Sequence, residues 1–228
     1  DPDTDGDGVL DEEISDSGEF RGSKKRTPPS SAPPVTATPL VPLTNAGFEV
    51  FPLGERQFTR TVASGNPDEI VTADPIPGWT VSSSAAGSYN PPTASHPGET
   101  HEGQNVAWSA GGTISQVVSS VLRANTRYTL TVEVGNRMEP PSPGYRVELY
   151  AGGGFLAEDT STVSSPHGTF RTSTVTVDIG AVHPRLGQFL EIRLRSEGQQ
   201  TNFDDVRLNA TSFVPPPSNS LTNAGHEE

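Results

Sequence analysis

Residues 127–134 read RYTLTVEV, a stretch in which polar and apolar side chains alternate. Alternation places every second side chain on one face of an extended chain, so it predicts a half-buried β-strand. Five other stretches show the same alternation or β-branched enrichment: TISQVVSS at 113–120, YRVELYA at 145–151, FRTSTVTVDI at 170–179, FLEIRLRS at 189–196 and FDDVRLNA at 203–210. Turn-forming glycine, proline and asparagine residues separate them.

Three shorter stretches raise the expected number of strands to about nine: FEVF at 48–51, WTVS at 79–82 and NVAWS at 105–109. The chain has 23 glycines, 22 prolines and 31% hydrophobic residues, and no amphipathic helix longer than a turn or two. Many short strands joined by turns are typical of an antiparallel sandwich. We therefore predict an all-β fold, an antiparallel β-sandwich or jelly roll.

Composition divides the chain into four segments. Residues 1–20 are acidic, 21–42 form a linker rich in Pro, Ser and Thr, 43–210 form the globular domain, and 211–228 hold a second proline spacer. LTNAG at 43–47 returns at 221–225, an offset of 221 − 43 = 178 residues. This spacing is about one domain and predicts a tandem repeat. The second copy either begins a new domain or is a tail that pairs with a neighbouring subunit by strand addition.

The formal net charge of −13 excludes some classes of partner. Residues 1–20 contribute −9 of it, and the rest has 19 acidic against 15 basic residues. Nucleic-acid binding requires a basic face, so no nucleic acid is expected. No apolar run approaches the roughly 18 residues of a membrane span. The chain has no cysteine, and a secreted bacterial protein at the cell surface fits this composition.

The acidic segment DPDTDGDGVLDEE predicts a calcium loop, because Ca²⁺ binds six to eight oxygens and alternating carboxylates can supply them. The preferred ligand set is Asp3, Asp5, Asp7, the Val9 carbonyl and Asp11, closed by Glu13 or Glu12. A second register starts at Asp1 and puts Glu12 at the twelfth position. The segment resembles thrombospondin type-3 and dockerin-like calcium repeats.

Six motifs of the globular segment occur in a characteristic order: LTNAGFE at 43–49, PGWT at 77–80, EGQNVAWS at 102–109, ISQVV at 114–118, YTLTVEVG at 128–135 and FDDVRL at 203–208. In this order they resemble the galactose-binding-like jelly-roll superfamily, particularly bacterial carbohydrate-binding modules. The resemblance implies a structural Ca²⁺ shared by Glu49 with Asp204 or Asp205.

A glycan site needs aromatic faces beside polar side chains. Trp108, Tyr145 and Arg146 are the chosen candidates, with Trp108 equally suited to the core. The wider set includes Tyr89, Tyr150, Arg137 and Trp79, of which Trp79 is expected in the core. The cluster His96 to Glu102 lacks H-E-x-x-H spacing and is expected to be a solvated loop.

No nucleophile motif or metal triad stands out, so we predict that the chain is not an enzyme. The leading hypothesis is a calcium-stabilised, adhesive or structural repeat unit of a secreted bacterial surface or fibre protein, which assembles with copies of itself through the repeat ends. The alternative is a glycan-binding module of an adhesin or glycan-active enzyme.

Overall fold

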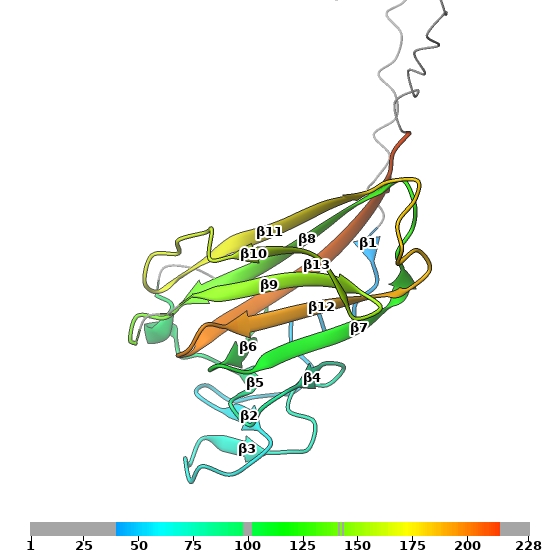
Figure 1. Cartoon of the computed structure of the whole chain (residues 1–228). Coiled ribbons are helices and arrows are strands. Elements are labelled where there is room, and N and C mark those ends of the chain that lie inside the picture. Colours follow the sequence, from blue (N-terminus) through cyan, green and yellow to red (C-terminus); the bar gives the residue numbers. More distant parts are fainter. Residues whose placement is uncertain (1–39, 98–101, 141, 143, 215–228) are drawn as a thin grey trace, which may run out of the picture. The chain divides into compact units, whose positions relative to one another are not determined.

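Two β-sheets pack face to face in the computed structural model, which describes residues 40–97, 102–140, 142 and 144–214 (Figure 1). The larger sheet has the strand order β11-β8-β13-β6-β5-β2-β3, with β1 paired to β13. Its strands are β1 (Leu40–Val41), β2 (Phe58–Arg60), β3 (Glu69–Val71), β5 (Ala86–Tyr89), β6 (Val106–Ser109), β8 (Thr126–Asn136), β11 (Thr169–Ile179) and β13 (Thr201–Ser212).

The smaller sheet has the order β10-β9-β12-β7-β4. Its strands are β4 (Thr80–Val81), β7 (Thr113–Val121), β9 (Tyr145–Ala151), β10 (Gly154–Thr160) and β12 (Phe189–Ser196). A single 3₁₀ turn, η1 (Thr93–Ser95), is the helical element in the described part of the chain. All strand pairs are antiparallel except β2 with β3.

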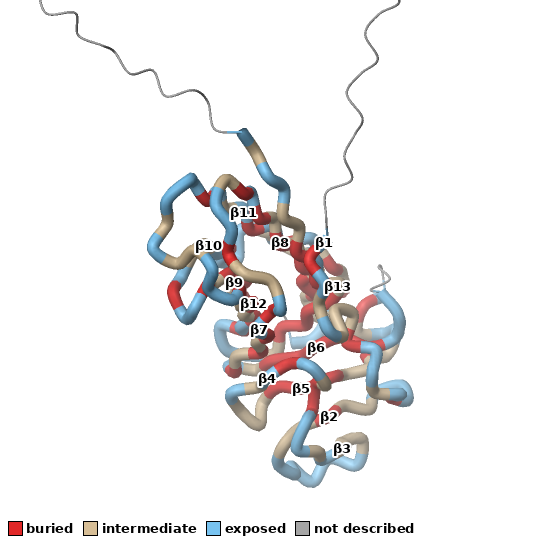
Figure 2. Tube along the Cα trace, turned by 90° about the vertical axis from the view of Figure 1, so that its right-hand side faces the viewer, coloured by how far each residue is buried: buried red, intermediate tan, exposed pale blue. Residues whose placement is uncertain are grey.

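The hydrophobic core lies between the sheets because the strands alternate. On β8, Leu130 and Val132 are fully buried, whereas Thr129 and Thr131 between them are partly exposed. Ile192 and Leu194 of β12 meet them from the other sheet as members of the same core cluster. Figure 2 shows the buried residues gathered along the strands and the exposed residues in the connections.

The predicted all-β sandwich is confirmed, and the six longest predicted strands start and end within two residues of the expected positions. The sequence analysis missed β10, which has seven residues. FEVF at 48–51 is a turn and not a strand. Phe48 has a φ of 61° there and packs its ring 5.4 Å from that of Trp79. The strands β1, β2, β3 and β5 have two to four residues, too few to show a period in the sequence.

Two sequence predictions lie outside the described residues: the acidic segment with Asp3, Asp5, Asp7, Val9, Asp11 and Glu13, and the second LTNAG copy. In the part of the chain that the structure describes, no helix is long and apolar enough to cross a membrane.

Candidate functional site

A pocket of about 490 Å³ lies on the larger sheet, at the end formed by β2, β5 and β6. This volume falls within the range of small-molecule sites. Three aromatic side chains line the pocket: Phe58, Tyr89 and Trp108. Four charged side chains also line it: Arg56, Arg60, Arg137 and Asp68. Polar and small residues complete the lining: Ser64, Asn66, Pro92, Ser95 and Gln200.

Strand register brings the aromatic residues together on the outer face of the larger sheet. Phe58 of β2 pairs with Tyr89 of β5, and Trp108 of β6 pairs with Asn202 of β13. Ala107, the neighbour of Trp108, belongs to the core between the sheets, so Trp108 points to the opposite face. The rings of Phe58 and Trp108 meet edge to face, with centroids 5.8 Å apart. The three aromatic residues therefore form a wall on which a flat ligand can stack.

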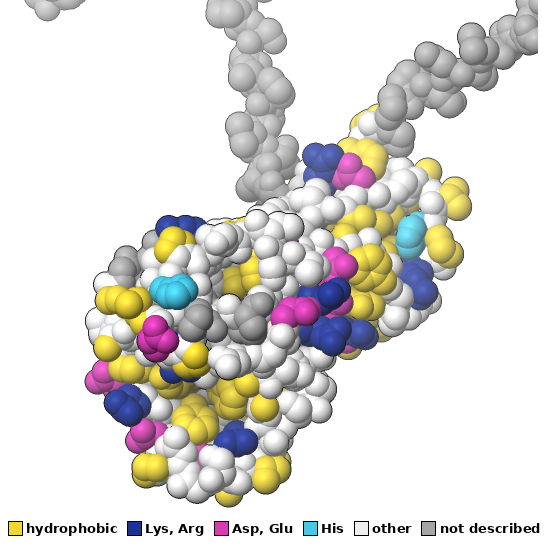
Figure 3. Space-filling model, turned by 60° about the vertical axis from the view of Figure 1, so that its left-hand side comes forward, with side chains coloured by type: hydrophobic (Ala, Val, Ile, Leu, Met, Phe, Trp, Pro, Cys, Tyr) yellow, Lys and Arg dark blue, Asp and Glu magenta, His cyan; other side chains and the backbone are white. Residues whose placement is uncertain are grey.

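The arginines give the pocket a positive lining. Arg56 forms an ion pair with Asp68 at 3.5 Å, and both side chains are exposed at the rim. Arg60 Nη1 lies 3.9 Å from Glu69 Oε2, at the distance limit of an ion pair. Hydrogen bonds from Ser64 lower the pKa of Glu69, so this carboxylate is ionised and already has donors. In the lower part of Figure 3, basic side chains lie around exposed apolar ones.

Three nitrogen donors at this pocket are buried without an acceptor: Trp108 Nε1, Arg60 Nε and Arg137 Nε. An unpaired buried donor costs about 1–3 kcal/mol. A ligand with acceptor atoms can offset this cost, so the pocket is chemically suited to a molecule that combines an aromatic ring with oxygen acceptors.

A hydrogen-bonded chain links Arg137 to the sheet. Arg137 Nη1 donates to Gln200 Oε1 at 2.9 Å, and Gln200 Nε2 donates to Asn202 Oδ1 at 2.9 Å. Asn202 Nδ2 lies 3.0 Å from His96 Nε2, within hydrogen-bond distance. His96 is buried and packs against the tilted ring of Phe170, with ring centroids 4.6 Å apart, so the expected solvated loop is wrong at this position.

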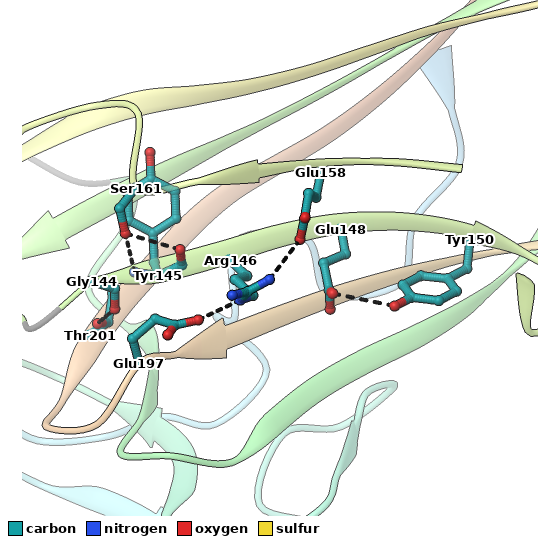
Figure 4. Close-up of polar contacts among 9 residues, drawn as sticks. All are labelled: Gly144, Tyr145, Arg146, Glu148, Tyr150, Glu158, Ser161, Glu197 and Thr201. Carbon is teal, nitrogen blue, oxygen red and sulfur yellow. Dashed lines mark hydrogen bonds and ion pairs between the residues drawn. The ribbon is translucent and has the colours of Figure 1, made fainter. Parts of the chain in front are cut away.

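Of the three residues chosen for ligand binding, the structure places only Trp108 at the pocket. Tyr145 is buried on β9, and its hydroxyl donates to Asp159 Oδ2 at 2.8 Å. Arg146, also on β9, bridges Glu197 at 2.5 Å and Glu158 at 3.2 Å (Figure 4). The structure thus separates them from Trp108, because β9 belongs to the smaller sheet and β6 to the larger one.

The prediction of a bound Ca²⁺ is corrected: the described residues contain no group of three or more His, Cys, Asp or Glu that could hold a metal ion. Glu49 Oε1 accepts from the backbone N–H groups of Gln104 and Asn105. Asp205 pairs with Arg207 at 2.8 Å.

Asp204, the third expected ligand, is fully buried. Burial, with the carboxylates of Glu102 and Glu49 nearby, raises the pKa of Asp204 to about 9. Without a cation, the Asp204 carboxyl group is therefore protonated at neutral pH.

Sequence reasoning missed Phe58, Arg56, Arg60 and Asp68 as site residues. They lie on or beside β2 and β3, strands of three residues each, which carry no periodic signal. Tyr89 and Arg137 were in the wider candidate set, and the residue type was the only signal for them.

Comparison with known proteins places the chain among cyclases. The family HpiC1-like, described as HpiC1 cyclase, matches residues 39–209. A Stig cyclase, Fisc from Fischerella sp. TAU, solved in complex with (3Z)-3-(1-methyl-2-pyrrolidinylidene)-3H-indole, is 30% identical. The match covers 78% of this chain and 100% of that one, with a TM-score of 0.66.

Two further structures are similar. A cyclase from Fischerella sp. TAU in complex with 4-(1H-indol-3-yl)butan-2-one is 31% identical over 77% of this chain and 99% of that one, with a TM-score of 0.61. An apo cyclase from Fischerella sp. is 29% identical over 78% and 98%, with a TM-score of 0.66. No curated protein sequence matches the chain.

These findings overturn the prediction of a non-enzymatic repeat unit with a fibre or adhesive role, and its glycan-binding alternative. The jelly-roll part of the predicted resemblance is confirmed by the fold, but the family is a different one, and no thrombospondin-type repeat is shown. The sequence misled because a binding pocket built from several short strands leaves no catalytic motif. The matched family covers most of the chain, and this chain therefore belongs to the HpiC1-like cyclase family.

Proposed function

We propose that this chain is a cyclase that binds a small molecule with a fused aromatic ring in the pocket of Phe58, Tyr89 and Trp108. One observation carries the proposal: three aromatic side chains and three guanidinium groups surround a single pocket of about 490 Å³. The indole compounds in two of the similar structures support an aromatic substrate of this size.

A cyclase joins two atoms of one substrate, so its main task is to hold a flexible chain folded over its reactive ring. The wall of Phe58 and Trp108 would fix the ring, because an aromatic ring stacks on a face and packs against an edge. Donors from Arg60 and Arg137, which also line the pocket, would bind an acceptor atom of the substrate chain. Ring and chain are then oriented by groups on β2 and β6 and by Arg137, which directly follows β8.

Charge also decides which ring closures the pocket would favour. The lining holds three arginines and one aspartate, and Asp68 is paired with Arg56. Fixed positive groups stabilise negative charge that develops on an oxygen or nitrogen acceptor in the transition state. We propose a ring closure in which electron density moves toward such an acceptor while Tyr89 and Trp108 exclude water. The reaction is an isomerisation, so the mass of the substrate is unchanged.

The test is a screen of indoles with unsaturated side chains, incubated with the full chain and followed by chromatography and mass spectrometry. We expect a product of unchanged mass and altered retention time. Trp108→Leu should reduce its rate at least about tenfold, since one misplaced contact at a site can cost this much or more. Tyr150→Leu is the matched control, because Tyr150 lies on β9 and outside the pocket. Equal rates in both variants would refute the assignment of the site.

The extracellular location and the segment boundaries at 20, 42 and 210 stay predictions. Cell fractionation and limited proteolysis test them.

A further inference from the structure

Two arginines at the pocket have poor ionic partners. Within the described ranges, Arg137 has no carboxylate at ion-pair distance, and its hydrogen-bond acceptor is the neutral amide of Gln200. Arg60 has one carboxylate, Glu69, at 3.9 Å, and only 18% of the Arg60 side chain is exposed. Both have a buried Nε without an acceptor. The protein thus holds two partly desolvated guanidinium groups beside one cavity.

Desolvated cations destabilise the folded protein unless an anion compensates them. One exposed arginine with such a partner is Arg127, which binds Asp178 through two hydrogen bonds of 2.6 Å. The exposed Arg56 at the rim also has its own carboxylate. Among the three arginines of the pocket, Arg60 and Arg137 therefore lack a close carboxylate partner.

We infer that the substrate carries a carboxylate, which Arg137 and Arg60 bind while its aromatic ring lies against Trp108. This inference rests on the proposed function, because it concerns the ligand of the same pocket. Guanidinium groups bind carboxylates through parallel N–H···O bonds, a geometry that a ketone oxygen cannot use in full.

The hydrogen-bonded chain behind Arg137 adds to this argument. Gln200 and Asn202 fix the direction in which Arg137 presents its guanidinium group, and both are themselves held by β13 and by buried His96. A side chain positioned in this way loses less entropy on binding than a free one. Arg137 is thus organised as an anion receptor before the ligand arrives.

Two probes of equal shape test the inference by isothermal titration calorimetry on the full chain. 3-(1H-indol-3-yl)propanoate differs from 4-(1H-indol-3-yl)butan-2-one in one group only, since a carboxylate oxygen replaces the methyl group. We expect the acid to bind at least about tenfold more tightly, because charge-assisted hydrogen bonds are roughly twice as strong as neutral ones. Its advantage should shrink in high salt, whereas the affinity for the ketone should not change.

Arg137→Gln and Arg60→Gln should each bring the two affinities to within about threefold, because the acid loses a charge-assisted contact whereas the ketone loses only a neutral one. An unchanged circular dichroism spectrum shows that each variant is folded. Arg195→Gln, an exposed arginine on β12 outside the pocket, should keep the full preference. If both probes bind equally to the unmodified chain, the inference of a carboxylate on the substrate is refuted and the proposed function stays in place. If neither probe binds, both the carboxylate inference and the proposed function are refuted. Tighter binding of 3-indoxyl phosphate than of the acid would overturn the carboxylate in favour of a phosphate.

Discussion

Replacing Asp159 with asparagine tests the hydrogen-bond network that holds Tyr145 in the smaller sheet. Asp159 is 4% exposed and accepts four hydrogen bonds. Oδ2 accepts from the hydroxyls of Tyr145 at 2.8 Å and Ser173 at 2.5 Å, and Oδ1 accepts from Thr162 N at 3.1 Å and Thr162 Oγ1 at 2.5 Å. An asparagine of the same shape offers one accepting oxygen and one donating NH₂ group.

The backbone N–H of Thr162 cannot turn away, so the amide oxygen must face it. The NH₂ group then meets the hydroxyls of Tyr145 and Ser173, which have to reverse from donors to acceptors. The Tyr145 hydroxyl already accepts from Val163 N at 3.2 Å, so its reversal is hindered. Hydrogen bonds to a charged group contribute about 1.5–3 kcal/mol each. With two of the four disturbed, we expect Asp159→Asn to lower the free energy of unfolding by about 2–4 kcal/mol.

The loss should depend on pH. Burial raises the pKa of Asp159, but the hydrogen bonds from Ser173, Thr162 and Tyr145 outweigh it and hold the pKa below its ordinary value. A carboxyl group with a lower pKa in the folded state stabilises the protein above its unfolded pKa of about 3.9, and this contribution is lost as the pH falls through the folded value. The gap between the natural chain and the variant should therefore be full at pH 7 and narrow below about pH 4.

Urea denaturation at pH 7 and at a series of acidic pH values measures this gap. At pH 7 the melting temperature should also fall by about 4–16 °C, from roughly 2–4 °C per kcal/mol for a domain of this size. Asp178→Asn is the control, because Asp178 is half exposed and its pair with Arg127 contributes at most about 1 kcal/mol. A loss at Asp159 no larger than that at Asp178, or one that does not change with pH, would refute the reasoning.

Three further substitutions probe the pocket and its support. Gly87→Ala should displace β2 and abolish probe binding in calorimetry, because the new Cβ would lie 1.9 Å from the Thr59 carbonyl oxygen; unchanged affinity would contradict the close approach. Trp79→Phe removes two hydrogen bonds of 3.1 Å from Nε1 and should cost about 1–3 kcal/mol in urea denaturation, without altering probe affinity. Gln200→Leu leaves Arg137 without its acceptor and should weaken binding of the indole propanoate several-fold but not of the ketone; a loss for both would point to a general change in the pocket.

The strand pattern could be predicted from sequence where a strand is long enough to repeat its period. The stretch at 127–134 falls within β8, and YRVELYA coincides with β9, because burial between two sheets selects every second side chain. The stretch at 48–51 failed because Phe48 is buried from a turn, and local alternation does not distinguish the two cases.

The site was less accessible to this reasoning. Residue type pointed to Trp108, which does line the pocket. It pointed equally to Tyr145 and Arg146, which lie in the other sheet. The calcium prediction was wrong for the described residues, because spacing along the chain does not show which carboxylates the fold brings together or which hydrogen bonds they make.

The sequence by itself determined an all-β sandwich, since alternation and turn residues act over a few neighbouring positions. The tertiary structure alone decided that Phe58, Trp108 and Arg137 line one pocket, and that two of its arginines lack good carboxylate partners. The physical reason is that strand order joins β2, β5, β6 and β13 from distant parts of the chain. Contacts between such segments depend on the packing of the whole sheet, and no local pattern encodes them.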